Sequence, residues 1–220
     1  EWLRIIDSFL RDKTIKSVSR ECLIAYATAQ KSVTKMREVM TLDVPKLLLG
    51  DCESDETYVG GSWKNKAIHI RIRGSKRGRG TSKQAVFGIM QRDPQRVRVW
   101  LVKNSKGRTT TPIIRSIVCL GSRIYTDGHK GYRRLPRYGY FHDWVDHEAG
   151  EYVRGNVHTQ TIDGYWGLLK THLDSIGGIR KSRLHLFIGE HQWRYNFKHL
   201  TRQEQTKRIY LLVKEFGGKS

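Results

Sequence analysis

Three aspartates have the residue type and the local setting for metal-assisted phosphoryl transfer. Asp55 lies within an expected strand, Asp127 directly follows another, and Asp163 falls in the first turn of an expected helix. Carboxylates that are brought together repel one another unless a cation lies between them, and hard divalent ions take such oxygen ligands. Two bound ions can stabilise the attacking and the leaving oxygen of an in-line displacement. These residues therefore indicate a site for Mg²⁺ or Mn²⁺, with two ions expected.

Spacing alone gives this triple little weight. The chain has 21 acidic residues, so a triple with any chosen spacing is easily found by chance. Side chains alternate between the two faces of a strand, which places Asp51 and Glu53 on the same face as Asp55. By pattern alone, any of these three could be the ligand from this strand.

The helix that carries Asp163 has a mixed flank beside its apolar stripe. At about 100° per residue, Asp163, Gly167 and Lys170 fall on one side, where the carboxylate could reach the sheet and the lysine a nucleic-acid backbone. The missing side chain of Gly167 would leave room for a close neighbour. The plainer alternative, favoured without further evidence, is an amphipathic helix with a solvated edge. The apolar stripe consists of Ile162, Trp166, Leu169 and Leu173.

The net charge predicts a polyanionic partner. The chain has 41 Lys and Arg against 21 Asp and Glu, a formal net charge of +20. Nucleic acid is the commonest partner of so basic a globular chain, because neutralising phosphates releases condensed counterions. A membrane surface is the weaker candidate, since no apolar run approaches about 18 residues. A ribosomal or merely soluble basic protein is the remaining alternative.

Residues 64 to 83 concentrate cations around glycines, a composition typical of a loop that approaches phosphates. A solvated loop would need no partner, but its like charges repel one another without one, which favours contact with DNA. The glycine spacing does not match a phosphate-binding P-loop. The DNA contacts expected here are Lys64, Lys66, Arg77, Arg79 and Lys83.

Histidines and cysteines indicate no zinc site. His142, His147 and His158 lie on different expected elements, whereas zinc ligands are usually closely spaced. A structural or phosphate-contacting role is expected for them, with His158 nearest the active site. The three cysteines are far apart and form neither a CxxC pair nor a disulfide framework, which indicates a reduced, intracellular setting. The chain begins without methionine and without a visible signal peptide, so its start is interpreted as a truncation.

The elements expected around these residues form one mixed α/β domain with helical ends. Residues 1 to 42 are predicted to form three short helices. The pattern suggests a helix-turn-helix, but another kind of basic helical hairpin is an equally good interpretation. The third would present Lys31, Lys35 and Arg37 to phosphate, and Pro45 marks a boundary. The predicted strands are 47–60, 67–73, 85–91, 97–103, 122–126 and 140–145, and the predicted later helices are 111–119, 161–176, 182–199 and 206–216.

Several long strings resemble the DDE transposases of a group of bacterial insertion sequences related to the eukaryotic Merlin elements. They match in order over residues 46 to 200. The resemblance implies an RNase H-like fold, a mixed five-stranded sheet flanked by helices. The strings are DETYVGGSWKNK (55–66), RGRGTSK (77–83), VFGIMQR (86–92), IYTDGHKGY (124–132), EYVRGNVHTQTIDGYWGLLK (151–170) and HLFIGEHQWRYN (185–196).

The resemblance also implies roles for single residues. Asp55 in DETY matches the first catalytic aspartate, Asp127 in YTD the second, and Asp163 the third acidic position, while Lys170 matches a lysine regarded as a DNA contact. Two departures bear on activity: the family often has Glu at position 163 and Asn where this chain has Gln160. A shorter carboxylate must bring its helix closer to keep magnesium distances of about 2.1 Å. Members also commonly carry a zinc ribbon ahead of the helix-turn-helix. Nothing in this chain could supply one, and truncation would explain that absence.

The function implied is that of a transposase that cleaves DNA and joins the freed 3′-hydroxyl to target DNA. The expected division is a helix-turn-helix-like DNA-binding segment over 1–44, the catalytic domain over 45–200, and a C-terminal helix and tail over 201–220. Element ends and target DNA are the expected partners, and a homodimer or larger assembly is expected to form on DNA. His158 is expected beside the active site, in contact with DNA. The alternatives are a DNA-binding protein that kept the fold but lost catalysis, and a nuclease that cuts without joining.

Overall fold

The computed structural model describes residues 1–60, 68, 83–128, 130–146, 150–151 and 153–216. The chain divides into two compact units: Pro45–Lys181 forms one, and Glu1–Val44 with Ser182–Ser220 forms the other. One division falls at the boundary expected between residues 44 and 45. The other falls near residue 181, so residues 182–200, expected with the sheet, belong with the N-terminal helices. The strand expected over 67–73 lies, except for Ile68, outside the described residues.

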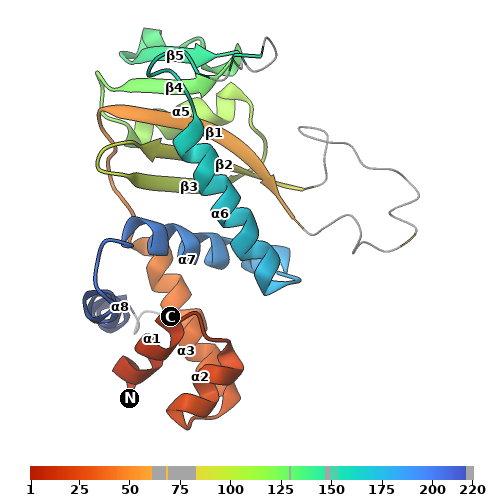
Figure 1. Ribbon diagram of the computed structural model, residues 1–220, viewed down its shortest axis with the longest axis vertical. Coiled ribbons are helices and arrows are strands. Elements are labelled where there is room, and N and C mark those ends of the chain that lie inside the picture. The colour runs from red at the N-terminus through yellow and green to blue at the C-terminus, as the bar shows by residue number, and fades with distance from the viewer. Residues whose placement is uncertain (61–67, 69–82, 129, 147–149, 152, 217–220) are drawn as a thin grey trace. The chain divides into compact units, whose positions relative to one another are not determined.

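The unit from Pro45 to Lys181 is built on a mixed five-stranded sheet with the order β3-β2-β1-β4-β5 (Figure 1). β1, β2 and β3 form an antiparallel meander, whereas β4 and β5 run parallel to β1. Parallel neighbours need a crossover, which a helix provides between β3 and β4. This is the RNase H-like arrangement that was expected. The strands are β1 (Asp51–Val59), β2 (Gln84–Gln91), β3 (Arg96–Val102), β4 (Arg123–Asp127) and β5 (Phe141–Val145).

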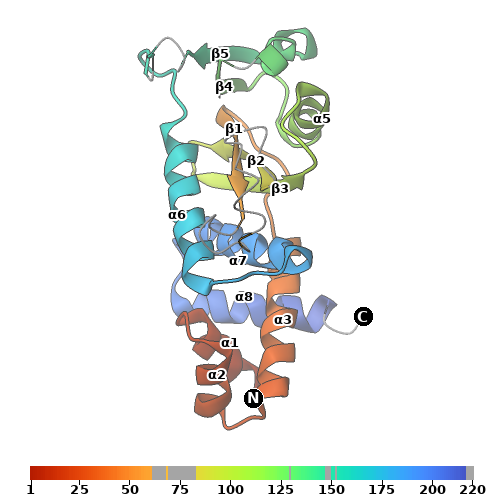
Figure 2. The same cartoon turned by 90° about the vertical axis from the view of Figure 1, so that its right-hand side faces the viewer.

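Helices cover both faces of this sheet. α5 (Gly107–Ile117) lies on one face and α6 (Gln160–Ile176) on the other, as Figures 1 and 2 show. The apolar stripe predicted for α6 is confirmed at Ile162, Trp166 and Leu169, which are buried. Among the described residues there are also three short 3₁₀ helices: η3 (Lys130–Tyr132) and η4 (Leu135–Tyr138) precede β5, and η6 (Lys181–Arg183) follows α6.

α5 begins at Gly107, earlier than the predicted start near Thr111. A start near Thr111 would put Pro112 in the first turn, where the missing N–H of proline costs no hydrogen bond. The structure instead continues the helix through Pro112. The preceding turn is ordered by Asn104, whose Oδ1 accepts from the Lys106 backbone N–H at 3.1 Å and from the Thr109 hydroxyl at 2.9 Å.

The other unit contains five helices among its described residues, packed around one apolar core. α2 and α3 are joined by residues 23–25, in which Leu23 has a left-handed conformation. No helix in the described part of the chain is long and apolar enough to cross a membrane. The helices are α1 (Trp2–Leu10), α2 (Ile15–Cys22), α3 (Tyr26–Leu42), α7 (Leu184–Asn196) and α8 (Arg202–Phe216).

A buried ion pair connects α3 and α7 within this unit. Arg37 Nε lies 2.6 Å from Glu190 Oε2, and its guanidinium lies over the Phe187 ring at 4.1 Å. Arg194 also approaches Glu190, with Nε at 3.0 Å from Oε1. The expectation that Arg37 is available to phosphate is therefore wrong, since its charge is paired inside the unit. Lys35 is only 19% exposed and pairs with Glu38 at 3.6 Å.

α8 begins at Arg202, earlier than the predicted start near residue 206. Thr201 and Glu204 form a capping box, in which the Thr201 Oγ1 accepts from the Glu204 backbone N–H at 3.3 Å. In return, Glu204 Oε2 accepts from the Thr201 backbone N–H at 2.7 Å. Threonine followed three residues later by glutamate is the sequence signature of such a start. The sequence therefore contained the signal, and the prediction missed it.

Candidate active site

The strand register places Asp55 beside Asp127. β1 and β4 are parallel, and their last recorded pair is Ser54 with Thr126, so Asp55 and Asp127 are the next residue on each strand. Alternation along the strands puts both aspartates on the face that α6 covers. Carboxyl ends of adjacent parallel strands meet at one edge of a sheet, and the structure thus brings these two predicted residues together.

Asp55 is held by a tryptophan of α6. Trp166 Nε1–H donates to Asp55 Oδ2 at 2.8 Å. The indole reaches the carboxylate because Gly88, the β2 partner of Asp55 in the register, has no side chain. A Cβ at Gly88 would lie 2.6 Å from Trp166 Cη2 and 3.2 Å from Ile162 Cδ1, which is inside contact distance. Gly88 is therefore required by the close approach of the helix to the strand.

The charges around Asp55 oppose its ionisation. Its pKa is raised well above the ordinary value, first by burial and then by the negative charges of Glu56, Asp127 and Asp163. A backbone hydrogen bond acts in the opposite direction without cancelling these effects. Asp127 and Asp163 are therefore close enough to Asp55 to contribute to its raised pKa, and a nearby cation would oppose this effect.

Asp127 has an unsatisfied carboxylate oxygen. Its Oδ1 is buried and accepts no hydrogen bond from any residue that the structure describes. Thr126, just before it, donates its hydroxyl proton to the Asp127 backbone carbonyl at 2.8 Å and lies 3.0 Å from His142 Nε2. Because the hydroxyl proton faces the carbonyl, the proton in the second contact belongs to His142. Burial lowers the pKa of His142, consistent with a neutral imidazole in this structural role.

The segment after Asp127 is anchored to β1 and α5 on the opposite face of the sheet. Tyr132, which is fully buried in η3, donates its hydroxyl to Glu56 Oε2 at 2.9 Å. Gly107 at the start of α5 meets Gly131 so closely that a Cβ there would lie 2.5 Å from the Gly131 carbonyl oxygen. These contacts fix where the chain leaves β4 and hence where Asp127 is presented.

Asp163 reaches the same face from the first turn of α6. It is exposed, and Thr159 Oγ1 donates to its Oδ2 at 3.2 Å. A carboxylate in the first turn of a helix interacts favourably with the positive end of the helix dipole. The structure thus brings all three predicted aspartates to one region, with Asp55 and Asp127 on the sheet and Asp163 on the helix above it.

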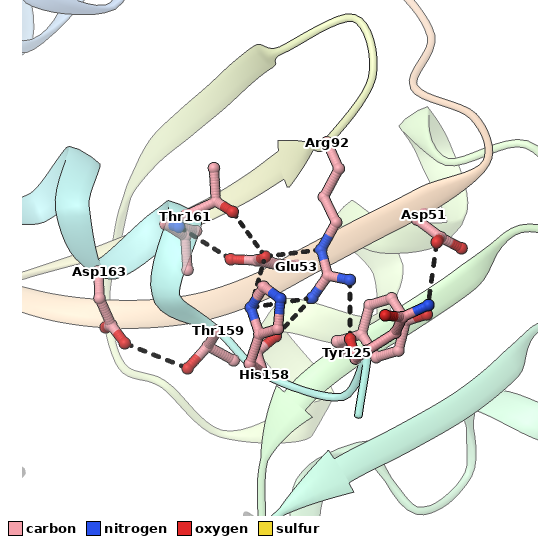
Figure 3. A network of polar contacts seen from close by, with 10 residues as sticks. Asp51, Glu53, Arg92, Tyr125, His158, Thr159, Thr161 and Asp163 are labelled. Carbon is pink, nitrogen blue, oxygen red and sulfur yellow. Dashed lines mark hydrogen bonds and ion pairs between the residues drawn. The ribbon is translucent and has the colours of Figure 1, made fainter. Parts of the chain in front are cut away.

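Glu53 of β1 has several polar partners, which Figure 3 shows. It is completely buried and lies 2.7 Å from Arg92 Nε. Two groups at the start of α6 also donate to it: the Thr161 hydroxyl at 2.8 Å and the Ile162 backbone N–H at 2.9 Å. His158 Nδ1 lies 3.4 Å from the same carboxylate. Glu53 therefore has a set of protein partners.

These partners distinguish the three acidic residues that the strand pattern left open. Asp51 is exposed and accepts from the Tyr125 hydroxyl at 3.4 Å, away from Asp127 and Asp163. Glu53 is saturated by an arginine and by the helix start. Asp55 accepts from Trp166 of α6, and the negative charges of Asp127 and Asp163 contribute to its raised pKa. Its selection as a metal ligand rests on the string resemblance and stays a prediction.

The predicted DNA contacts differ in exposure, and some of them lie outside the described residues. Lys83 and Lys170 are exposed, whereas His158 is 23% exposed and lies against Arg92 and Glu53. Gly167 was expected to admit a close neighbour, but a Cβ added there would meet no atom of the described residues within 4 Å. Four predicted cations and one histidine lie outside the described residues: Lys64, Lys66, Arg77, Arg79 and His147.

Sequence reasoning missed Arg92, Gly88 and the polar role of Trp166. A glycine inside an otherwise apolar strand often marks a close approach of another element, so the string VFGIM contained a signal for Gly88. The tryptophan was expected only to pack, and nothing local predicts the partner of its N–H. For Arg92 the sequence has no comparable signal, because its partner Glu53 is on another strand.

The donor set suits a hard divalent cation, although no three acidic, histidine or cysteine side chains among the described residues are arranged as a complete metal site. Asp127 offers a buried oxygen without a hydrogen-bond partner, and Asp55 is a carboxylate whose ionisation its neighbours oppose. A bound cation would stabilise both groups, because it would interact with the Asp127 oxygen and favour the ionised form of Asp55. Asp55 and Asp127 therefore have carboxylate oxygens of the kind that Mg²⁺ or Mn²⁺ takes as ligands.

The fold and this part of the sheet define an RNase H-like domain with acidic residues in the middle of β1 and at the end of β4. Comparison with known families places the chain more narrowly. Residues 47–196 match the family described as the ISXO2-like transposase domain. Because the match spans more than half of the chain, the protein belongs to this family.

Individual relatives agree with this assignment. An uncharacterized protein in transposable element ISH50 of Halobacterium salinarum is 30% identical over 203 residues, which cover 88% of this chain and 68% of the relative. An uncharacterized transposase-like protein of Haemophilus influenzae is 30% identical over 96 residues, covering 44% of this chain and 77% of the relative. A chain in the solved structure of the simian T-cell lymphotropic virus intasome in complex with PP2A regulatory subunit B56 gamma also aligns with this protein. The alignment covers 92% of this chain and 74% of that chain. Its TM-score is 0.41 and its identity 11%.

Proposed function

We propose that the protein is a DDE-type transposase that cleaves DNA at the ends of an insertion sequence and joins those ends to target DNA. The observation that carries this proposal is the convergence of Asp55, Asp127 and Asp163 in a chain of the ISXO2-like transposase domain family. The same strings that identify the family also support a wider kinship with the Merlin elements.

Asp55, Asp127 and Asp163 would hold the metal ions, Mg²⁺ or Mn²⁺, with two expected. When bound, such ions stabilise the attacking and leaving oxygens of a phosphoryl transfer. Trp166 keeps the Asp55 carboxylate oriented through its indole N–H. The unsatisfied Oδ1 of Asp127 is the oxygen that gains most from a cation, since it has no described protein donor.

DNA is the proposed partner, both as element ends and as target. The net charge of +20 supplies a sequence-independent attraction to phosphate. Lys170, two turns along α6 from Asp163, and Lys83 at the start of β2 are exposed cations from which backbone contacts are proposed. Pairing of two element ends requires at least two copies of the chain in the active assembly.

The test is a cleavage and strand-transfer assay with element-end DNA and Mg²⁺ or Mn²⁺. Asp55→Asn, Asp127→Asn and Asp163→Asn should each lower both reactions by about a hundredfold or more, because each removes a proposed ligand charge. Asp51→Asn is the matched control, since it changes an exposed aspartate on the same face of the same strand and should remain active. A wild-type chain that binds DNA but neither cuts nor joins it with either metal would refute the proposal.

A second candidate is a transposase-derived DNA-binding protein without catalysis. Two sequence features favour it: an aspartate at position 163 where relatives often have glutamate, and Gln160 in place of asparagine. This candidate would be supported if the wild-type chain did not cleave DNA and if all three Asp→Asn variants bound DNA as well as the wild type does. Cleavage without joining would instead indicate a nuclease.

A further inference from the structure

Glu53 and Arg92 form a buried ion pair beside the acidic cluster for which the proposed chemistry has no direct use. Glu53 is fully buried, and the Arg92 side chain is 16% exposed. A buried carboxylate is costly unless it is paired and hydrogen-bonded, so this pair must be fully satisfied to be tolerated. The partners of Glu53 come from the end of β2 and from the start of α6 (Figure 3).

Two hydrogen bonds attach α6 to β1. The Ile162 backbone N–H donates to Glu53, and the Trp166 indole donates to Asp55. Glu53 and Asp55 lie on the same face of the strand, and Ile162 and Trp166 lie about one turn apart on the helix. A slip of one residue would turn the helix by about 100° and break both bonds.

Asp163 directly follows the first of these attachments. Its direction relative to the sheet therefore depends on the rotation of α6 that Glu53 and Asp55 set. An aspartate has one methylene fewer than a glutamate, so it has less freedom to correct a misplaced helix.

Arg92 orders the segment that enters α6. Its Nη1 donates to the Asn156 carbonyl at 2.8 Å and its Nη2 to the His158 carbonyl at 2.8 Å. The guanidinium also lies over the Tyr125 ring of β4 at 4.0 Å. A planar guanidinium can make these contacts and the Glu53 bond together, whereas a lysine ammonium lacks the plane and the spread of donors.

We propose that Glu53 and Arg92 are positioning residues that set the depth and rotation of α6, and so hold the Asp163 carboxylate opposite Asp55 and Asp127. This inference rests on the proposed function. Neither residue contacts DNA or metal in this role. Their effect passes through the helix start, by way of the Thr161 and Ile162 donors.

The alternative is a pair that only stabilises the fold, and the chain provides a matched comparison. Arg37 and Glu190 form an ion pair at 2.6 Å with exposures of 15% and 4%, in the other compact unit. Arg92 and Glu53 lie at 2.7 Å with exposures of 16% and 0%. Arg37 also lies on an aromatic ring, as Arg92 does. Arg37→Lys is therefore the control for Arg92→Lys.

The experiment measures Mn²⁺ binding to the full chain without DNA, beside thermal unfolding and metal-dependent cleavage. Binding is followed by isothermal titration and by the Mn²⁺-induced broadening of the Trp166 indole N–H signal in NMR spectra. This proton donates to Asp55 and so reports on the proposed site. The chain has six tryptophans, so the signal is assigned with Trp166→Phe.

Both lysine variants should lower the unfolding temperature, but only Arg92→Lys should weaken Mn²⁺ binding, by about tenfold or more, as expected for residues that orient ligands. The Mn²⁺ concentration for half-maximal cleavage should rise to the same extent. Thr161→Val, which removes one donor to Glu53 and leaves the ion pair intact, should weaken binding by a few fold and serves if Arg92→Lys does not fold.

If Arg92→Lys, or Thr161→Val where Arg92→Lys does not fold, bound Mn²⁺ as tightly as the wild-type chain does, the positioning role would be overturned. The proposed function would still stand if the wild-type chain were active. Equal weakening of binding by Arg37→Lys would also overturn it, because general destabilisation would then explain the effect. A wild-type chain that neither binds Mn²⁺ nor cleaves DNA would refute the proposed function and this inference with it.

Discussion

Replacing Gly88 by alanine is expected to push Trp166 away from the sheet. The added methyl carbon would lie 2.6 Å from Trp166 Cη2 and 2.7 Å from Cζ2, so the indole must move by about 1 Å to restore ordinary contact. Ile162 Cδ1 at 3.2 Å limits the movement of the methyl in another direction. A displaced indole no longer donates to Asp55 with good geometry.

The cost follows from two effects. Overpacking of a buried site costs about 1–3 kcal/mol, and loss of an ordinary hydrogen bond adds about 0.5–1.5 kcal/mol. Together they lower the free energy of unfolding by about 1.5–4.5 kcal/mol, or the unfolding temperature by about 3–18 °C at about 2–4 °C per kcal/mol. The measurement is thermal unfolding followed by near-ultraviolet circular dichroism, which reports on the tryptophan environment.

Gly167→Ala is the matched control, because a Cβ there meets nothing within 4 Å among the described residues. Alanine in the interior of a helix is favoured over glycine by about 1 kcal/mol, so this variant should be slightly stabilised. If Gly88→Ala unfolded within about 1 °C of wild type, the close packing of α6 on β2 would be refuted.

Three further predictions concern charge and capping. Asp127→Asn should raise the free energy of unfolding in EDTA by about 1 kcal/mol, because it removes a charge that raises the pKa of Asp55; a lower free energy of unfolding would contradict this. His142 has a pKa lowered by burial, so its neutral form stabilises the fold above about pH 6.5, and this stability is lost as the pH falls below that value. His142→Gln should flatten the decline in urea midpoints between pH 7 and pH 5, and an unchanged slope would argue against it. Thr201→Ala removes the hydroxyl that caps α8 and should cost about 1 kcal/mol in urea unfolding, whereas an unchanged midpoint would exclude that cap.

Local patterns in the sequence predicted much of the sheet unit. Alternating and apolar runs predicted the strands that became β1 to β5 to within a few residues, since side-chain period and turn residues are local properties. The apolar stripe of α6 was predicted for the same reason. Start positions were less accurate at α5 and α8. Turn contacts of Asn104 precede α5, and the capping box of Thr201 and Glu204 begins α8.

The acidic residues show how far the sequence by itself could go. It determined that Asp51, Glu53 and Asp55 share one face of a strand, because alternation has a period of two. Resemblance of strings selected Asp55 and predicted Asp127 and Asp163 as its companions. Which partner each carboxylate of β1 meets is a long-range property, and only the tertiary structure decided it: Arg92 and the start of α6 surround Glu53, whereas Trp166 reaches Asp55.

The same distinction applies to the helical unit. The helical period placed Arg37 on α3 but did not determine whether its charge faces solvent or a partner. The partner, Glu190, is on α7, far away in the chain, and the pairing follows from how the helices pack around their shared core. Local sequence determines which elements form and which face of each is apolar. The contacts between distant elements, such as those of Glu53 and Asp55 with α6, depend on packing that no local pattern encodes.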